Sequence, residues 1–285
     1  MKNKSQSFWL SLFFAVSVLP VVAGFVYALL YSFGLAGVYE IGFTLKNWAA
    51  ILSSPEIINS FLFSFYIAVV SISIALFVAL WFVINYGAHF DKGILSYVIY
   101  FPLSIPAIVA AFFIIQLLSK SGLISRIFFN LNLIDNINSF PDLVNDNLGI
   151  GIILAHTLLA IPFFIIFLLG LYHSQNLENL KQLSFTLGAD KKQTTKRVLL
   201  PILLNKVYPT IILYFIFVLS SYEIPLLLGQ QYPQMVSVFA VRKLQRFDLA
   251  DIPQAYVIIS VYVLIVIVSL FILFRKRKLE YDFDN

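Results

Sequence analysis

The segment SFTLGADKKQTTKRVLLP, residues Ser184–Pro201, separates two long apolar stretches of the chain. It contains four basic residues, one glycine and one proline, whereas the sequence on either side is rich in Leu, Ile, Phe and Val. A short basic segment between two stretches long enough to cross a bilayer is typical of a loop at a membrane surface. The number of apolar stretches around this segment therefore predicts the fold.

Composition and apolar stretches predict an all-α polytopic membrane protein. Hydrophobic residues make up 60% of the 285 residues and charged residues only 12%, and the mean hydropathy is +0.91. A bilayer core of about 30 Å needs about 20 apolar residues per helix. Five stretches meet this requirement without a charge, and a sixth contains only Glu223. We predict one domain, 1–285, with transmembrane helices at about 8–33, 57–86, 94–118, 148–172, 203–228 and 252–274.

The distribution of Lys and Arg predicts that both termini are cytoplasmic. Cytoplasmic loops retain positive charge during insertion. With an inward N-terminus, twelve basic residues lie on the inner side and six on the outer side, and Lys206 is assigned to neither. The first stretch is expected to be a retained helix, because no small-residue cleavage site follows it. The net charge of +5 then reflects topology and contact with anionic lipid, and no nucleic-acid partner is expected.

The quoted segment is then cytoplasmic, and its residues predict a helix, a turn and a second helix. Gly188 permits the left-handed backbone that ends a helix. Asp190 and Gln193 form a capping pair that starts a second short helix, and Pro201 is expected to end it where the fifth membrane helix begins. The first helix carries more apolar side chains than one face can bury. An apolar patch of this kind at a membrane surface favours a docking partner.

Within a predicted cytoplasmic coupling loop at 178–201, residues 182–201 resemble the EAA loop of ABC importer permeases. In that family the loop begins Glu-Ala-Ala, continues to a Gly-Ala pair and ends in Leu-Pro at the next helix. The residues that match are Gly188, Ala189, Val198, Leu200 and Pro201. The chain departs from the pattern at residues 182–184, which are Gln-Leu-Ser. This departure concerns the ionic contact made by the usual glutamate and not the docking geometry.

The resemblance extends over nearly the whole chain. Residues 43–52, 58–80 and 100–114 resemble the outer segment and the second and third helices of these permeases. Residues 220–229 and 249–264 are similar to the fifth and sixth helices of the branch that imports iron(III), thiamine and polyamines. The family has a MetI-like fold, in which a six-helix unit pairs with a second permease, the same chain or a different one, around a pathway. The resemblance also implies a substrate-binding protein outside and a location in the bacterial cytoplasmic (inner) membrane.

In this family the EAA loop is a coupling helix that contacts a separate ATPase subunit. Carried over to this chain, the contact falls on Gln182, Leu183, Ser184, Phe185, Thr186, Leu187, Gly188 and Ala189. The chain lacks the phosphate-cradling pattern GxxxxGK[ST], so ATP is expected to bind the partner. Its three histidines are scattered and it has no cysteine. We therefore expect a transport subunit with no cofactor, no metal site and no catalytic residues of its own.

Glu223 is the candidate for a pathway residue. A charge at the bilayer centre costs about 2.5 kcal/mol or more, so an acid in a span is expected to face water, a partner or the bundle interior. A solvated position near the interface and a structural hydrogen bond are the alternatives. Pro102 and Pro106 remove backbone donors and can leave carbonyl groups to line a pathway, although such prolines also serve packing alone.

Two other classes of function are the alternatives to an ABC permease. A self-contained secondary transporter or channel requires ion-coupling carboxylates or a polar stripe, and only Glu223 is available. A membrane-embedded enzyme acting on lipids requires clustered polar residues at one interface, and the sequence shows none. The motifs do not define the solute.

Overall fold

The structure is a computed structural model that describes residues 4–37, 42–89, 98–246, 248–249 and 251–283. Within these ranges every regular element is a helix, which confirms the all-α prediction. Six segments are long and apolar enough to cross a membrane, as predicted. They are Phe8–Ser32, Pro55–Tyr86, Ala107–Asn130, Ile150–Ser174, Lys191–Leu219 and Asp251–Phe271.

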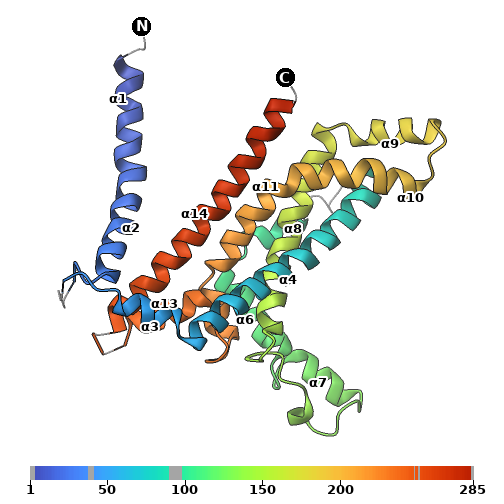
Figure 1. Cartoon of the computed structure of the whole chain (residues 1–285). Coiled ribbons are helices and arrows are strands. Elements are labelled where there is room, and N and C mark those ends of the chain that lie inside the picture. Colours follow the sequence, from blue (N-terminus) through green and yellow to red (C-terminus); the bar gives the residue numbers. More distant parts are fainter. Residues whose placement is uncertain (1–3, 38–41, 90–97, 247, 250, 284–285) are drawn as a thin grey trace. The chain divides into compact units, whose positions relative to one another are not determined.

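The elements follow one another along the chain as shown in Figure 1. The α-helices are α1 (Lys4–Phe13), α2 (Leu19–Ser32), α3 (Lys46–Leu52), α4 (Pro55–Tyr86), α6 (Ala107–Leu118), α7 (Leu123–Asn130), α8 (Ile150–Ser174), α9 (Leu177–Thr186), α10 (Lys191–Thr194), α11 (Leu200–Leu219), α12 (Glu223–Leu228), α13 (Val236–Leu244) and α14 (Asp251–Phe283). The π-helical turns are η1 (Phe14–Val18) and η5 (Thr195–Leu199). The 3₁₀ turns are η2 (Gly87–His89), η3 (Phe101–Ser104) and η4 (Ile137–Ser139).

The chain divides into two compact units, one of Met1–Ser60 with Val236–Asn285 and the other of Phe61–Met235. In the first unit α2 packs against α14, where the Tyr31 ring stacks on Tyr256 with centroids 4.4 Å apart. The start of α14 is tied to α13, because the Asp251 carboxylate accepts from Lys243 Nζ at 3.4 Å and from Arg246 at 3.1 Å.

In the second unit α8 is the central helix, and it contacts α6, α11 and α12. Its side chains Ala155, Ala160, Phe164 and Leu168 are fully buried. Gly149, with φ +65°, precedes α8, and a Cβ there would lie 2.6 Å from Ile67 Cδ1 of α4. Figure 1 shows α9 and α10 at one end of α8 and α7 near the other, so the two ends of this unit are built from different loops.

Two of the expected spans differ in their details. The third was expected at 94–118, but residues 94–97 lie outside the described residues and α6 begins only at Ala107, after the turn η3. The fifth was expected at 203–228, but its helix runs from 191 to 219 and then breaks. Two prolines explain why α6 begins so late. Pro102 and Pro106 lack backbone donors, and the residue before a proline is driven out of the helical region.

Candidate functional site

The first candidate site is a helical hairpin made of α9, a turn at residues 187–190, and α10, hereafter the coupling hairpin. Gly188 has φ +87°, a backbone conformation that L-residues with side chains rarely adopt. Its N–H donates to the Phe185 carbonyl at 3.0 Å, and the Ala189 N–H donates to the Ser184 carbonyl at 3.0 Å. These bonds close the C-terminal end of α9 and reverse the chain direction.

The second arm of the coupling hairpin begins with a capping box. The Asp190 carboxylate accepts from the Gln193 N–H at 2.6 Å, and the Gln193 side chain accepts from the Asp190 N–H at 3.3 Å. Between the arms, the buried hydroxyls of Ser184 and Thr194 lie 2.7 Å apart. Ser184 Oγ also donates to the Lys181 carbonyl, so the Thr194 hydroxyl is the donor between the arms. One buried hydrogen bond therefore ties the two arms to each other.

The base of the coupling hairpin is fastened to α8. The Tyr172 hydroxyl at the end of α8 donates to Glu178 Oε2 in the first turn of α9 at 2.6 Å. This hydrogen bond, supported by the Lys181 ammonium 3.3 Å away, lowers the pKa of Glu178. The carboxylate therefore stays ionised at neutral pH, and its charge-assisted hydrogen bond ties the first turn of α9 to the last turn of α8.

Large apolar side chains of the coupling hairpin are exposed. Leu183 is 58% exposed, Phe185 42% and Leu187 81%. Within the expected contact set, Gln182, Thr186 and Gly188 are also exposed and Ala189 is half-buried. Ser184 differs, because it is buried against Thr194 and positions the arms instead of offering a surface. The expected contact residues thus lie together, with Ser184 beneath them.

Pro201 does not end the second short helix as expected. Residues from Lys191 to Leu219 form one continuous helical run through α10, the π-turn η5 and α11, with Pro201 in the first turn of α11. Pro201 removes one backbone hydrogen bond from this run, and the wider π-turn just before it accommodates the proline ring. The coupling hairpin is consequently continuous with a membrane span.

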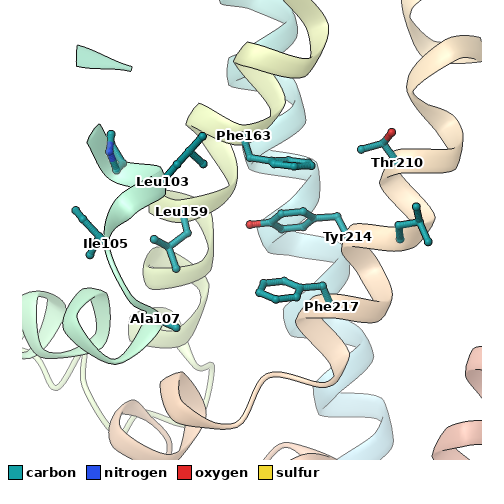
Figure 2. A pocket seen from close by; sticks show the side chains of 10 residues that line it. Leu103, Ile105, Ala107, Leu159, Phe163, Thr210, Tyr214 and Phe217 are labelled. Atoms are coloured by element: carbon teal, nitrogen blue, oxygen red, sulfur yellow. The ribbon is translucent and has the colours of Figure 1, made fainter. Parts of the chain in front are cut away.

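At membrane depth the second unit contains a pocket of about 450 Å³ between η3, α8 and α11. Its lining residues are Pro102, Leu103, Ile105, Ala107, Leu159, Phe163, Thr210, Leu213, Tyr214 and Phe217. Figure 2 shows the Tyr214 and Phe217 rings reaching from α11 towards α8, and the Phe163 ring reaching back from α8. The Phe163 and Tyr214 ring centroids are 5.0 Å apart. The lining has no charged side chain, and its side-chain polar atoms are the hydroxyls of Thr210 and Tyr214.

One wall of this pocket is non-helical backbone. Ile105 and Pro106 are extended, with ψ +120° and +147°. Leu159 and Phe163 lie opposite, in the middle of α8, so the interruption lies at the depth of the bilayer. Non-helical backbone at that depth is tolerated where it is covered by protein or lines a water-filled cavity. The sequence indicated this interruption through its prolines, but no periodicity marked the aromatic residues that complete the pocket.

Glu223 lies outside this pocket. It is the exposed first residue of α12, which follows the break after α11. At the break, Ser221 Oγ lies 3.0 Å from Nε2 of His156, a buried residue of α8. His156 is therefore a structural residue that holds the end of the fifth span.

Comparison with known proteins agrees with this architecture. Residues 85–276 match the family described as "Binding-protein-dependent transport system inner membrane component". Among curated proteins, none matches this sequence. A crystal structure of a bacterial alginate ABC transporter with a periplasmic protein bound to alginate pentasaccharide is similar, with TM-score 0.67, 16% identity and coverage of 94% of this chain and 90% of that chain.

A second similar structure is that of a bacterial ABC transporter involved in the import of the acidic polysaccharide alginate, with TM-score 0.67, 17% identity and coverage of 95% and 94% of the two chains. At such identities the likeness establishes the fold, while the family match spans well over half of the sequence. The chain therefore belongs to the binding-protein-dependent transport system inner membrane components, the multi-pass permease subunits of ABC importers.

Proposed function

We propose that this permease forms one half of a translocation pathway and is driven by a separate ATPase subunit that docks on the coupling hairpin. The supporting observation is that Leu183, Phe185 and Leu187 are exposed on a hairpin whose arms are fixed to each other. Apolar side chains held in one geometry bind a partner with little loss of conformational entropy. With the excess of basic residues on the side of the hairpin, both termini and the hairpin are assigned to the bacterial cytoplasm.

Cysteine crosslinking tests this docking, since the chain has no native cysteine. Thr186→Cys and Ala189→Cys, each paired with cysteines on the ATPase surface, are expected to crosslink in membranes. Lys206→Cys is the matched control, because Lys206 is exposed on α11 outside the hairpin. Absence of crosslinks at both hairpin positions, in a protein that still transports, would show that the ATPase docks elsewhere.

The pocket of Figure 2 is the part of the pathway that this chain supplies. It combines an interrupted helix, an aromatic wall and two hydroxyls, so solute passes by shape and apolar contact, with few hydrogen bonds. Thr210→Cys is expected to react with a membrane-impermeant thiol reagent and to lose uptake on reaction. Leu204→Cys, exposed on the same helix but outside the pocket, is the control and should not react. An unreactive Thr210→Cys throughout the transport cycle would exclude the pocket from the pathway.

We assign the chain to the branch that imports iron(III), thiamine or polyamines, because residues 220–229 and 249–264 resemble that branch. The solved relatives are titled as alginate transporters, and the pocket offers no basic side chain for an acidic sugar unit. Uptake should be measured for the three solute classes and for alginate oligosaccharides, with the cognate binding protein present. Uptake of alginate oligosaccharides alone would overturn the assignment to this branch.

A further inference from the structure

A second, smaller cavity lies at the cytoplasmic end of the second unit, between the end of α4 and the coupling hairpin. It measures about 70 Å³, and a single water needs only about 10–15 Å³ of such space, so a group of several atoms fits. The lining residues are Ile84, Asn85, Lys181, Phe185, Lys191, Thr194, Thr195 and Leu199. Five of these eight are polar or basic, in contrast to the pocket of Figure 2.

The charge around this cavity favours an anion. The described residues from 172 to 206 contain five lysines and one arginine but only two acids, Glu178 and Asp190. Both acids already serve the hairpin, because Glu178 accepts from Tyr172 and Lys181, and Asp190 caps α10. Lys191 has no carboxylate partner among the described residues. Two lysines offset by one neighbouring carboxylate leave about one positive charge, which matches one phosphodiester.

Hydrogen-bond donors are also available in the cavity. The ammonium groups of Lys181 and Lys191 provide several donors, and one N–H of the Asn85 amide is used on the Trp81 carbonyl, leaving the other. Thr195 adds a hydroxyl. The Thr194 hydroxyl is used on Ser184 and forms the floor, without acting as a donor to a ligand. The set suits a phosphate oxyanion, which accepts from several donors at once.

The depth of the cavity indicates that the phosphate comes from a lipid. Asn85 lies in the last turn of one membrane span, and Lys191 begins another. Beside Asn85, the exposed rings of Trp81 and Tyr86 contact each other with centroids 5.8 Å apart. Trp and Tyr concentrate at the level of lipid headgroups. Basic pockets between membrane helices on the cytoplasmic side bind anionic headgroups.

We propose that this cavity binds the phosphodiester of an anionic phospholipid from the inner leaflet. The phosphate joins α4 to both arms of the coupling hairpin through Asn85, Lys181 and Lys191, and the half-buried Ile84 contacts the apolar part of the lipid. Inner-leaflet lipid therefore acts as a structural ligand of the hairpin. Binding itself does not depend on the ATPase assignment, so the two proposals fail independently.

The test uses the purified full-length permease in neutral detergent, and the probe is phosphatidylglycerol, titrated while thermal unfolding is followed. Phosphatidylglycerol is expected to raise the melting temperature saturably. Lys191→Gln is expected to weaken the apparent affinity about fivefold, the loss of one lysine at a lipid surface. Lys192→Gln is the matched control, since it removes the same charge from the neighbouring exposed position outside the cavity.

Inorganic phosphate is titrated in a second arm to distinguish the sources. Saturable stabilisation by phosphatidylglycerol, with an apparent affinity about fivefold weaker in Lys191→Gln and unchanged in Lys192→Gln, supports the lipid site. Stabilisation by inorganic phosphate and none by phosphatidylglycerol would overturn the lipid as its source. Equal behaviour of the two variants and the wild type would overturn the cavity as the site.

Discussion

Replacing Gly188 by valine separates the conformation of the hairpin turn from its contacts. A Cβ at Gly188 would meet no heavy atom within 4 Å, so there is open space beside the turn. The cost comes from the backbone, because φ is +87° and an L-residue held in a left-handed conformation costs about 1–2 kcal/mol. A helix cap stabilises a helix by about 0.5–2 kcal/mol, so the strain energy is comparable to the stabilisation that the Asp190 capping box supplies.

We expect the undocked turn of the valine variant to relax away from positive φ, so that docking in the native geometry restores the strain and the binding free energy falls by up to its full amount. At about 1.4 kcal/mol per tenfold change, Gly188→Val is expected to weaken ATPase binding about 5- to 30-fold. Gly188→Asn is the control, because asparagine tolerates positive φ far better than a β-branched residue. Insertion of the six spans should be unchanged in both variants, since lipid burial does not involve this turn.

The assay measures the dissociation constant between the reconstituted permease and the purified ATPase, followed by uptake in proteoliposomes. Valine should weaken binding and reduce uptake, while asparagine should remain closer to wild type. Binding of Gly188→Val within twofold of wild type would refute the reasoning. Equal weakening by valine and asparagine would refute it too, because the effect would then come from a side chain in the interface and not from the backbone.

Three further outcomes are expected. Tyr172→Phe should lower the unfolding free energy at pH 7 by about 1 kcal/mol, less than a fully buried hydrogen bond to a charge because Glu178 is 35% exposed. The pKa of Glu178 is lowered in the folded protein from its ordinary value of 4.5. The stabilisation by the Tyr172–Glu178 hydrogen bond is therefore complete above pH 4.5 and is lost as the pH falls through the folded pKa, so the melting temperatures of wild type and Tyr172→Phe should converge in acid. A reporter active only outside should be active within residues 136–145 and silent within 191–196, and the opposite result would reverse the assigned topology. Glu223→Gln should reduce uptake at an unchanged membrane level if the acid borders the pathway, whereas normal uptake identifies a solvated residue near the interface.

The sequence predicted those features that depend on short-range chemistry. Apolar length identified six spans, and the glycine and the capping pair identified the turn at Gly188 and the start of α10 at Asp190. These features are local, since each follows from the backbone preferences of a few residues. Burial of Ser184 was not predictable in this way, because it depends on Thr194 ten residues away, across the hairpin.

The pocket was not predicted from the sequence, for a related reason. Phe163, Tyr214 and Phe217 look like ordinary lipid-facing or core aromatics in their own helices, and only packing of α8 beside α11 brings them together. The single acid in an apolar stretch, Glu223, drew attention because charge is visible in a sequence. The break after Leu219 moves that acid to a separate short helix, and apolar length alone does not reveal such a break.

The continuous helix from Lys191 to Leu219 connects the coupling hairpin to the wall of the pocket. The capping box fixes its first turn to the coupling hairpin, and Thr210, Tyr214 and Phe217 lie on its other half, in the wall of the pocket. At 1.5 Å per residue, Lys191 and Thr210 are separated by roughly 30 Å of helix. The run is helical throughout, but the π-turn η5 and Pro209 lie within it, and helices bend at such features. Beyond Leu219 the run ends, and Ser221 Oγ lies 3.0 Å from Nε2 of the buried His156, so the end of the aromatic wall is tied to α8 while the parts of the run nearer the hairpin can bend.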